Sequence, residues 1–167
     1  MRLELKEIIH SPGASISFSE NVDLSDLCYG TTYPVSEPVH ASGTVRNTAD
    51  VLMMKGAITT RLHGVCDRCA SDFTRDVELP IDVVLVEEFT NEDSEDEGVF
   101  PIEAGAADLE DIVRTVFVLN LDSKLLCKPD CKGICHRCGK NLNDGPCDCK
   151  KEIDPRFAAL QQLLDKK

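Results

Sequence analysis

Alternating apolar and polar positions between residues 35 and 89 predict an antiparallel β-meander. β-branched residues are concentrated there, as in Ile58-Thr59-Thr60 and Val83-Val84-Leu85-Val86, and such side chains favour the pleated, half-buried surface of a sheet. Glycine, asparagine and proline residues between the runs predict turns. The expected strands are residues 38–46, 50–64, 71–79 and 81–88.

The pattern before this meander is less regular. Residues 2–9 alternate enough to predict a first strand, which Pro12-Gly13 would end. We expect Cys28 to be a small buried apolar side chain. A short helical turn is expected nearby, packed by Leu24, Leu27 and Tyr29.

A helix is predicted from Ala107 or Asp108 to Leu121. Acidic residues in its first turn, Asp108 among them, suit the free N–H groups and the positive end of the helix dipole. Apolar residues recur at helical spacing along the segment. We expect this apolar stripe to cover one face of the sheet.

A short terminal helix is predicted to begin at Asp154-Pro155, because aspartate caps free amides and proline suits the first helical position. A helix this short needs a surface on which to dock. That surface is either the protein itself or the groove of a partner. Its apolar stripe consists of Phe157, Leu160, Leu163 and Leu164.

Negative charge dominates the chain, which has a formal net charge of −12. Residues 76–113 contain fourteen Asp or Glu and no Lys or Arg, and the most polar part, residues 91–98, is typical of a solvated loop. Such a protein repels a bare phosphate backbone. Its direct partners should be basic, such as ribosomal proteins or cationic patches of an enzyme.

Eight of the nine cysteines fall into close pairs, and this density indicates metal. Thiolates at such spacings can share one tetrahedral zinc ion at a bond length of about 2.3 Å. We expect two zinc ions with four cysteine ligands each, and eight thiolates with two ions would take the net charge from −12 to about −16. The expected ligands are Cys66, Cys69, Cys127, Cys131, Cys135, Cys138, Cys147 and Cys149.

One zinc site is predicted within the C-terminal cysteine run. Cys135-x2-Cys138 is followed by Gly139, which suits a turn with positive φ whose N–H groups donate to sulfur. Its second pair is Cys147-x-Cys149, delivered by a turn at residues 143–146. A spacing of one residue requires a local bend before both sulfurs can complete a tetrahedron.

The other site is predicted to join distant parts of the chain. Cys66-x2-Cys69 lies between two expected strands and therefore at the tip of a hairpin. Pairing it with Cys127 and Cys131 would attach the exit of the helix to this tip. A different grouping of the six later cysteines, which leaves the hairpin pair as a bare dithiol, stays open.

Other uses of the cysteines fit the sequence less well. Disulfides belong to oxidising compartments, whereas the charged N-terminal segment has no apolar signal and no run is long enough to cross a membrane, so we expect a cytoplasmic protein. Closed four-sulfur sites leave no open position for catalysis, and no catalytic spacing is present, so we predict no enzyme and no small-molecule substrate. His63 and His136 lie close to cysteine pairs and could substitute as ligands, but with eight cysteines available we expect each to support a ligand or to be exposed.

Basic residues surround the cysteine run. Between residues 124 and 151 the chain has seven Lys or Arg against three Asp. Because the sulfurs are buried while lysines project outward, this segment could form a small basic surface that contacts RNA. Alternatively, the lysines only offset the charge of the zinc-bound thiolates.

Together these features predict an α+β fold. Its body, residues 1–122, is an antiparallel β-meander sheet covered by a helix and carrying the CxxC hairpin. Residues 123–167 form a cysteine-rich zinc module and the short terminal helix.

Five segments together resemble the YceD family of bacterial proteins, and the resemblance spans most of the chain. Some relatives resemble the hairpin motif but lack the later cysteine run, which implies two semi-independent sites. The segments are Cys66-Asp67-Arg68-Cys69, Asp108-Leu109, residues 126–135, residues 138–143 and Asp154-Pro155-Arg156-Phe157.

The resemblance implies a cytoplasmic, non-enzymatic, metal-binding factor needed for accumulation of large-subunit ribosomal RNA, with nucleic acid as a candidate ligand. We therefore expect an adaptor in ribosome assembly that contacts a basic ribosomal protein, pre-ribosomal RNA or both. The alternative hypothesis is a thiol-based redox or metal-responsive regulator. A redox role for the Cys66 pair is less favoured, because such pairs stand at the start of a helix.

Overall fold

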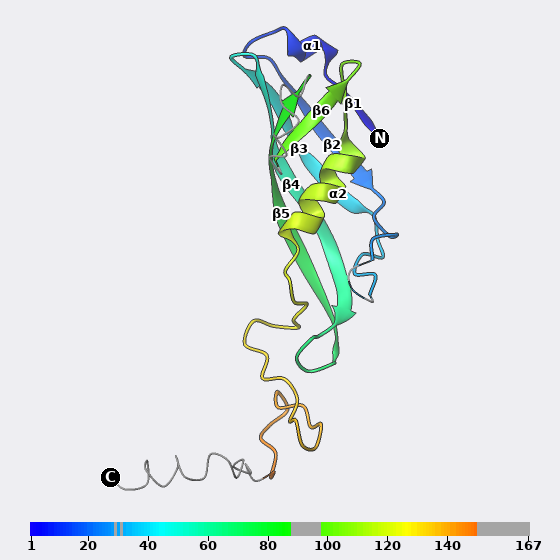
Figure 1. Cartoon of the computed structure of the whole chain (residues 1–167), viewed down its shortest axis with the longest axis vertical. Helices are drawn as coiled ribbons and strands as arrows, with labels where there is room; N and C mark the ends of the chain where they lie inside the picture. The colour runs from blue at the N-terminus through cyan, green and yellow to red at the C-terminus, as the bar shows by residue number, and fades with distance from the viewer. Residues whose placement is uncertain (29, 31, 88–97, 150–167) are drawn as a thin grey trace, which may run out of the picture.

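The computed structural model describes residues 1–28, 30, 32–87 and 98–149. Within these residues a single seven-stranded sheet, in the order β1-β7-β6-β5-β4-β3-β2, curls around the core (Figure 1). None of the helices described there is long and apolar enough to cross a membrane. In chain order the elements are β1 (Arg2–Glu4), α1 (Lys6–Ile9), β2 (Ser15–Val22), β3 (Val39–Thr48), β4 (Val51–Val65), β5 (Asp72–Val86), β6 (Val99–Glu103), β7 (Ala106–Asp108) and α2 (Leu109–Asn120).

The long β4–β5 ribbon connects the core to the cysteine-rich end of the protein. Its strands pair antiparallel from Leu52 opposite Leu85 to Val65 opposite Asp72. The ribbon extends beyond the other strands, and its loop, residues 66–71, lies next to the C-terminal module (Figure 1). One face of β4 is in the core, through Leu52, Met54, Ile58 and Leu62.

The predicted architecture, a β-meander covered by a helix, is wrong. The sheet continues beyond β5 through β6, which is parallel to β5, and then through β7 and β1, and it curls into a nearly closed, barrel-like form (Figure 1). The added strands have only three to five residues. Strands this short show no readable alternation, and pairing between the two ends of the body leaves no local pattern in the sequence.

The predicted helix is confirmed as α2. Its N-cap is Asp108, whose side chain accepts a hydrogen bond from the N–H of Glu110 at 3.1 Å. The helix contacts both β5 in the interior of the sheet and β1 at its edge, which is possible because the sheet curves around it. Its buried side chains are Leu109, Ile112, Val113, Val116 and Phe117.

Several expected strands have different bounds. Residues 2–9 form β1 and then the short helix α1 instead of one strand, and β2 was not predicted as a strand. The expected break at Pro80 is absent, because β5 passes through it opposite Ala57. At this point β5 has β4 on one side only, since β6 pairs only with residues 84–86. A proline can therefore be accommodated without losing a ladder hydrogen bond.

The prediction that Cys28 is buried is also wrong, because its side chain is exposed. Leu24, fully buried, fills the core at this turn instead. The polar loop before Gly98 and the terminal helix from Asp154 lie outside the described residues. The division of the chain at residue 122 stays a prediction.

Candidate metal centre

The loop between β4 and β5 is a knuckle that presents two sulfurs on the same side. The N–H of Ala70 donates to the carbonyl of Cys66 at 2.8 Å and closes the turn. Ala70 has a φ of 54°, a left-handed conformation that is uncommon for a residue with a Cβ atom. The turn brings Cys69 back towards Cys66, and both side chains are buried.

The segment Cys135–Gly139 repeats this turn. Here the N–H of Gly139 donates to the carbonyl of Cys135 at 2.8 Å, and Gly139 has a φ of 72°. The two CxxC motifs thus share the same closing hydrogen bond and the same left-handed residue after the second cysteine. Glycine suits that position because it has no Cβ atom to clash.

The module docks on the hairpin tip through backbone and side-chain hydrogen bonds. Asp67 holds Leu125 from both sides, since its carboxylate accepts from the Leu125 N–H at 2.7 Å and its own N–H donates to the Leu125 carbonyl at 2.9 Å. The side chain of Arg68 donates from Nη1 to the carbonyl of Cys131, and the backbone carbonyl of Arg68 accepts from the N–H of Ile134, both at 3.1 Å. These bonds place Cys127 and Cys131 beside the tip.

The first tetrad consists of Cys66, Cys69, Cys127 and Cys131, whose sulfurs all lie within 4.8 Å of one another. The Sγ atoms of Cys66 and Cys131 are 3.8 Å apart, and those of Cys69 and Cys127 are 3.7 Å apart. A tetrahedral ion with sulfur at about 2.3 Å requires sulfurs about 3.8 Å apart. The sulfurs are too far apart for disulfides, which need about 2.05 Å, and all nine cysteines are free.

The second tetrad lies entirely in the module. Its members, Cys135, Cys138, Cys147 and Cys149, also have all their sulfurs within 4.8 Å of one another. Residues 145–149 have no regular secondary structure, which supplies the bend that the one-residue spacing requires. This tetrad is closer to solvent than the first, because Cys138 is exposed and only Cys135 is buried.

Hydrogen bonds make the thiols of the first tetrad unequal. Burial by itself would raise the pKa of Cys66, but N–H groups of Cys127 and Arg68 favour the thiolate and lower that pKa to about 6. Burial and the neighbouring sulfurs raise the pKa of Cys127 to about 12. The side chain of Asn143 lowers the pKa of Cys131. The four thiols cannot all ionise so close together unless a cation replaces their protons.

The second tetrad has the same asymmetry. N–H groups of Cys138 and Arg137 lower the pKa of Cys135 to about 6. The pKa of Cys149 is raised to about 12, mainly by a hydrogen bond with the sulfur of Cys138 and to a smaller extent by burial. Each tetrad therefore has one thiol on its knuckle with a lowered pKa and another thiol with a raised pKa. Metal binding would require all four to lose their protons.

The structure brings the eight predicted cysteines together as two groups of four. Of the two groupings that the sequence left open, it has the one in which the hairpin pair joins Cys127 and Cys131. His63 and His136, the alternative ligands, are in neither group. That the cysteines bind metal stays a prediction. Sequence reasoning missed the supporting roles of Asp67 and Asn143, because both look like ordinary loop residues. Their position beside cysteines was the available signal, since ligand sulfurs are commonly supported by hydrogen bonds from neighbouring polar residues.

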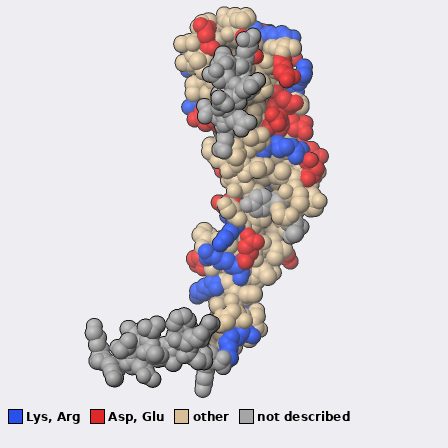
Figure 2. Space-filling view, viewed as in Figure 1, with Lys and Arg blue, Asp and Glu red and all other residues tan. Residues whose placement is uncertain are grey.

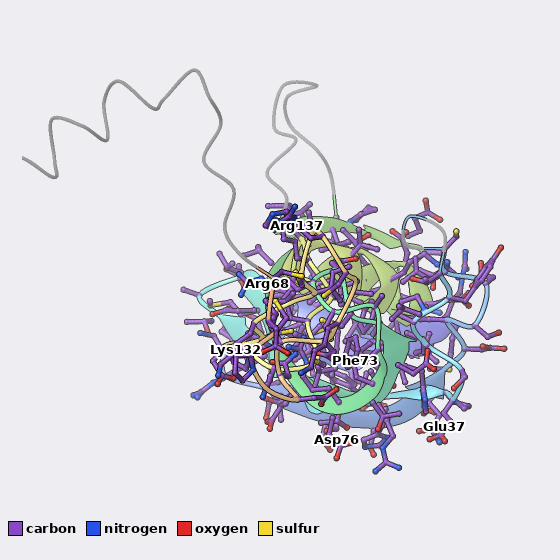
Figure 3. The ribbon with its side chains drawn as sticks, turned by 90° about the horizontal axis from the view of Figure 1, so that it is seen from below. Glu37, Arg68, Phe73, Asp76, Lys132 and Arg137 are labelled. Atoms are coloured by element: carbon purple, nitrogen blue, oxygen red, sulfur yellow. The ribbon has the colours of Figure 1, made fainter. Side chains whose placement is uncertain are left out.

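Acidic and basic side chains are unevenly distributed over the molecule, although the body carries both kinds. In the view of Figure 2, acidic side chains gather over the body, and basic ones gather near the cysteine-rich end. Seen from that end, Arg68, Lys132 and Arg137 lie away from the acidic residues Glu37 and Asp76 (Figure 3). The hairpin tip and the module thus both contribute basic side chains to this end of the molecule.

A family model and a named plant relative point to the same protein family. The family described as large ribosomal RNA subunit accumulation protein YceD matches residues 54–164. The large ribosomal RNA subunit accumulation protein YCED homolog 1 of Arabidopsis thaliana, which is chloroplastic, is 28% identical over 80% of this chain and 50% of its own length. The Bacillus subtilis protein YlbN, uncharacterized, is 25% identical over 98% of this chain and 96% of its own.

An uncharacterized Mycobacterium tuberculosis protein is 28% identical over 72% of this chain, and the match spans only 59% of the mycobacterial protein. No solved structure matches the chain. The matched family segment begins in β4 and contains the hairpin tip, α2 and both tetrads. Because that segment covers well over half of the sequence, the chain belongs to the YceD family.

Proposed function

We propose that this protein is a non-enzymatic, cytoplasmic, zinc-binding factor in ribosome biogenesis, which supports accumulation of large-subunit ribosomal RNA. The observation that carries the proposal is the pair of cysteine tetrads, whose sulfur separations of 3.7 and 3.8 Å in the first suit a tetrahedral ion. Family membership supplies the link to ribosomal RNA. Zinc is the usual occupant of such four-sulfur sites.

The tetrads suit a structural role for the ion better than a catalytic one. Four sulfurs complete a tetrahedral shell, so no coordination position remains for substrate or water. The first tetrad takes Cys66 and Cys69 from the body and Cys127 and Cys131 from the module. A bound ion would thus hold the module at a fixed orientation on the hairpin tip.

The division of charge supports two kinds of partner. Arg68, Lys132 and Arg137 give the module end a surface that attracts phosphate, so pre-ribosomal RNA would bind there. The acidic body, including the exposed Glu37, would face a basic ribosomal protein. The protein would in this way join an RNA segment to a basic protein during assembly.

The proposal is tested in cells that lack the gene and express plasmid-borne variants. We expect the wild-type protein to restore mature large-subunit RNA, measured against small-subunit RNA, and Cys131→Ser to fail. Cys28→Ser is the matched control, because Cys28 is exposed and belongs to neither tetrad. Equal large-subunit RNA levels with and without the gene would refute the ribosomal role, and full rescue by Cys131→Ser would refute the need for the first site.

Charge-reversal variants separate the two partner surfaces. Lys132→Glu changes an exposed residue of the module, whereas Glu37→Lys changes an exposed residue of the body. We expect ultraviolet crosslinking to RNA to fall in Lys132→Glu only and co-purification of a basic protein to fall in Glu37→Lys only. Crosslinking that is unchanged in Lys132→Glu would contradict direct RNA binding at the module.

A thiol-based or metal-responsive regulator remains the alternative function, and the lowered pKa values of Cys66 and Cys135, both about 6, favour it. Thiolates react with oxidants more readily than thiols. Access is poor, however, because these two side chains are only 2% and 6% exposed. Reversible release of bound metal by mild oxidant, with a matching loss of function, would support the regulator, and metal retained through oxidant exposure would refute it.

A further inference from the structure

Asn143 lies in the chain segment of the second tetrad, but its side chain contacts a sulfur of the first. It lies in the loop between Cys138 and Cys147, which are both members of the second tetrad. Its side-chain Nδ2 donates to the Sγ of Cys131, a member of the first tetrad, at 3.3 Å. A single amide therefore connects the backbone of one tetrad to a sulfur of the other.

Neighbouring groups fix the orientation of this amide. The Oδ1 atom of Asn143 accepts from the N–H of Lys132 at 3.0 Å, and Nδ2 also donates to Oδ1 of Asn141 at 2.8 Å. Exchanging the two ends of the amide would place oxygen against sulfur and nitrogen against an N–H donor. The geometry thus commits Asn143 to donate a hydrogen bond to Cys131.

The loop that carries Asn143 is held from several sides. Asn141 donates to the hydroxyl of Ser71 on the hairpin tip at 3.2 Å, and the N–H of Leu142 donates to the carbonyl of Gly133 at 2.8 Å. The two ends of the loop, however, are Cys138 and Cys147. Their sulfurs are both in the second tetrad, so a shared ion would hold the two ends of the loop at a fixed separation.

We infer that Asn143 couples the two metal sites, so that an ion in the second tetrad strengthens metal binding in the first. The ion fixes the loop, the loop presents the amide to Cys131, and the hydrogen bond stabilises the metal-bound thiolate. The coupling is reciprocal, since each site must then affect the other equally. This inference rests on the proposed metal binding and specifies how the two sites depend on each other.

The test uses the full-length protein in buffers of fixed free Zn²⁺. Occupancy of the first site is measured as protection of Cys66 and Cys131 from alkylation by mass spectrometry, and intact-mass measurement counts the ions. Loss of an outer hydrogen-bond partner typically lowers metal affinity by about 10- to 100-fold. We expect Asn143→Ala to lower first-site affinity by that factor while two ions still bind at high Zn²⁺.

A second-site knockout completes the cycle. Replacing Cys147 and Cys149 with serine should lower first-site affinity by a similar factor, and adding Asn143→Ala should cause little further loss. Asn143→Asp keeps the shape of the side chain but places oxygen against Cys131, so it should weaken the first site more than alanine does. Asp144→Ala is the control, because this exposed neighbour should leave both sites unchanged.

Independent sites would give a different result. Losses that add fully in the combined variant, or an Asn143→Asp protein with wild-type affinity, would overturn the coupling and leave two-site metal binding intact. A wild-type protein that binds no zinc would overturn the proposed function as well. Circular dichroism of each variant separates loss of binding from loss of folding.

Discussion

The sulfur of Cys66 lies 3.8 Å from that of Cys131, although 65 positions separate the two residues in the chain. Around them, the buried side chains of the first tetrad form an apolar cluster that is separate from the main core. The main core contains residues of the sheet and both helices but no cysteine. The folding of the body and the docking of the module should therefore respond differently to metal.

Removing the metal is expected to release the module and leave the body folded. A strong chelator should increase hydrogen exchange in residues 125–143, because the sulfurs that attach them to the tip would take up protons again and would no longer share an ion. Exchange in the centre of β4, such as Ile58 and Leu62, should change little, since these residues are in the main core. Hydrogen exchange with mass spectrometry measures both regions in one experiment.

The same experiment on Cys66→Ser gives an independent comparison. This variant should retain one ion in the second tetrad and show the increased exchange of residues 125–134 without chelator. Cooperative unfolding of β4 on metal removal would contradict the separation of the two cores.

Ala70 and Gly139 occupy the same position in the two knuckles, so exchanging alanine and glycine there should change zinc affinity in opposite directions. Ala70 has a φ of 54° and Gly139 a φ of 72°. A Cβ atom in this conformation costs about 1–2 kcal/mol, partly offset because glycine loses more entropy on folding. Ala70→Gly should therefore tighten zinc binding at the first tetrad by about 0.5–1 kcal/mol. Gly139→Ala should weaken the second tetrad by a similar amount.

Competition with a chromophoric chelator measures both affinities. A Cβ atom at Gly139 would meet no heavy atom within 4 Å, so the cost there is one of backbone conformation alone. Changes of the same sign in the two variants would show that the turns are not equivalent.

The features that the sequence predicted well are local ones. The cysteine spacings and the acidic, apolar-periodic start of the helix near Asp108 each depend on a few neighbouring residues, and the structure has the knuckles and the helix where they were expected. The grouping of Cys66 with Cys131 was one of two that the sequence left open, and it was favoured as the simplest way to give each CxxC a second pair. That reasoning depended on counting ligands and required no knowledge of the sheet.

The features that sequence reasoning missed depend on contacts between distant segments. The pairing of β1 with β7, for example Arg2 opposite Asp108, adds the edge strand of the sheet without any periodic pattern of its own. Pro80 indicated a break because proline cannot donate a ladder hydrogen bond. The sequence does not reveal that β5 has no partner strand on one side at this point. Asn143 looked like a turn residue, and only the fold shows that its amide reaches Cys131.

Asn47 is a fully buried polar residue that ties β3 to α1. Its Nδ2 donates to the carbonyls of Ile8 and Ile9, both at 2.8 Å, and its Oδ1 accepts from the N–H of Asp50 at 2.9 Å. Asn47→Ala would remove all three bonds and leave the buried carbonyl of Ile9 and the N–H of Asp50 without these partners, while the carbonyl of Ile8 still accepts from the N–H of Ser11 at 3.1 Å. We expect the free energy of unfolding to fall by about 2–4 kcal/mol, since each buried unpaired group costs about 1–3 kcal/mol.

Urea unfolding followed by circular dichroism measures this loss. Thr48→Ala is a suitable control, because this neighbouring residue at the end of β3 is exposed and should change stability by less than about 0.5 kcal/mol. Equal stability of Asn47→Ala and the wild type would show that water replaces the side chain at no cost.

Gly43 faces Gly56 across β3 and β4, and the close approach of the two backbones leaves no room for a side chain on either. A Cβ atom on Gly43 would lie 2.7 Å from the Cα of Gly56 and still closer to the carbonyl oxygen of Lys55. Because these obstacles are backbone atoms, the strands must separate to admit a methyl group. Gly43→Ala should therefore destabilise the body by about 1–3 kcal/mol or more in urea unfolding. Thr44→Ala, on the exposed side of the same strand, should be nearly neutral, and an equally neutral Gly43→Ala would show that the sheet can open here without losing its pairing.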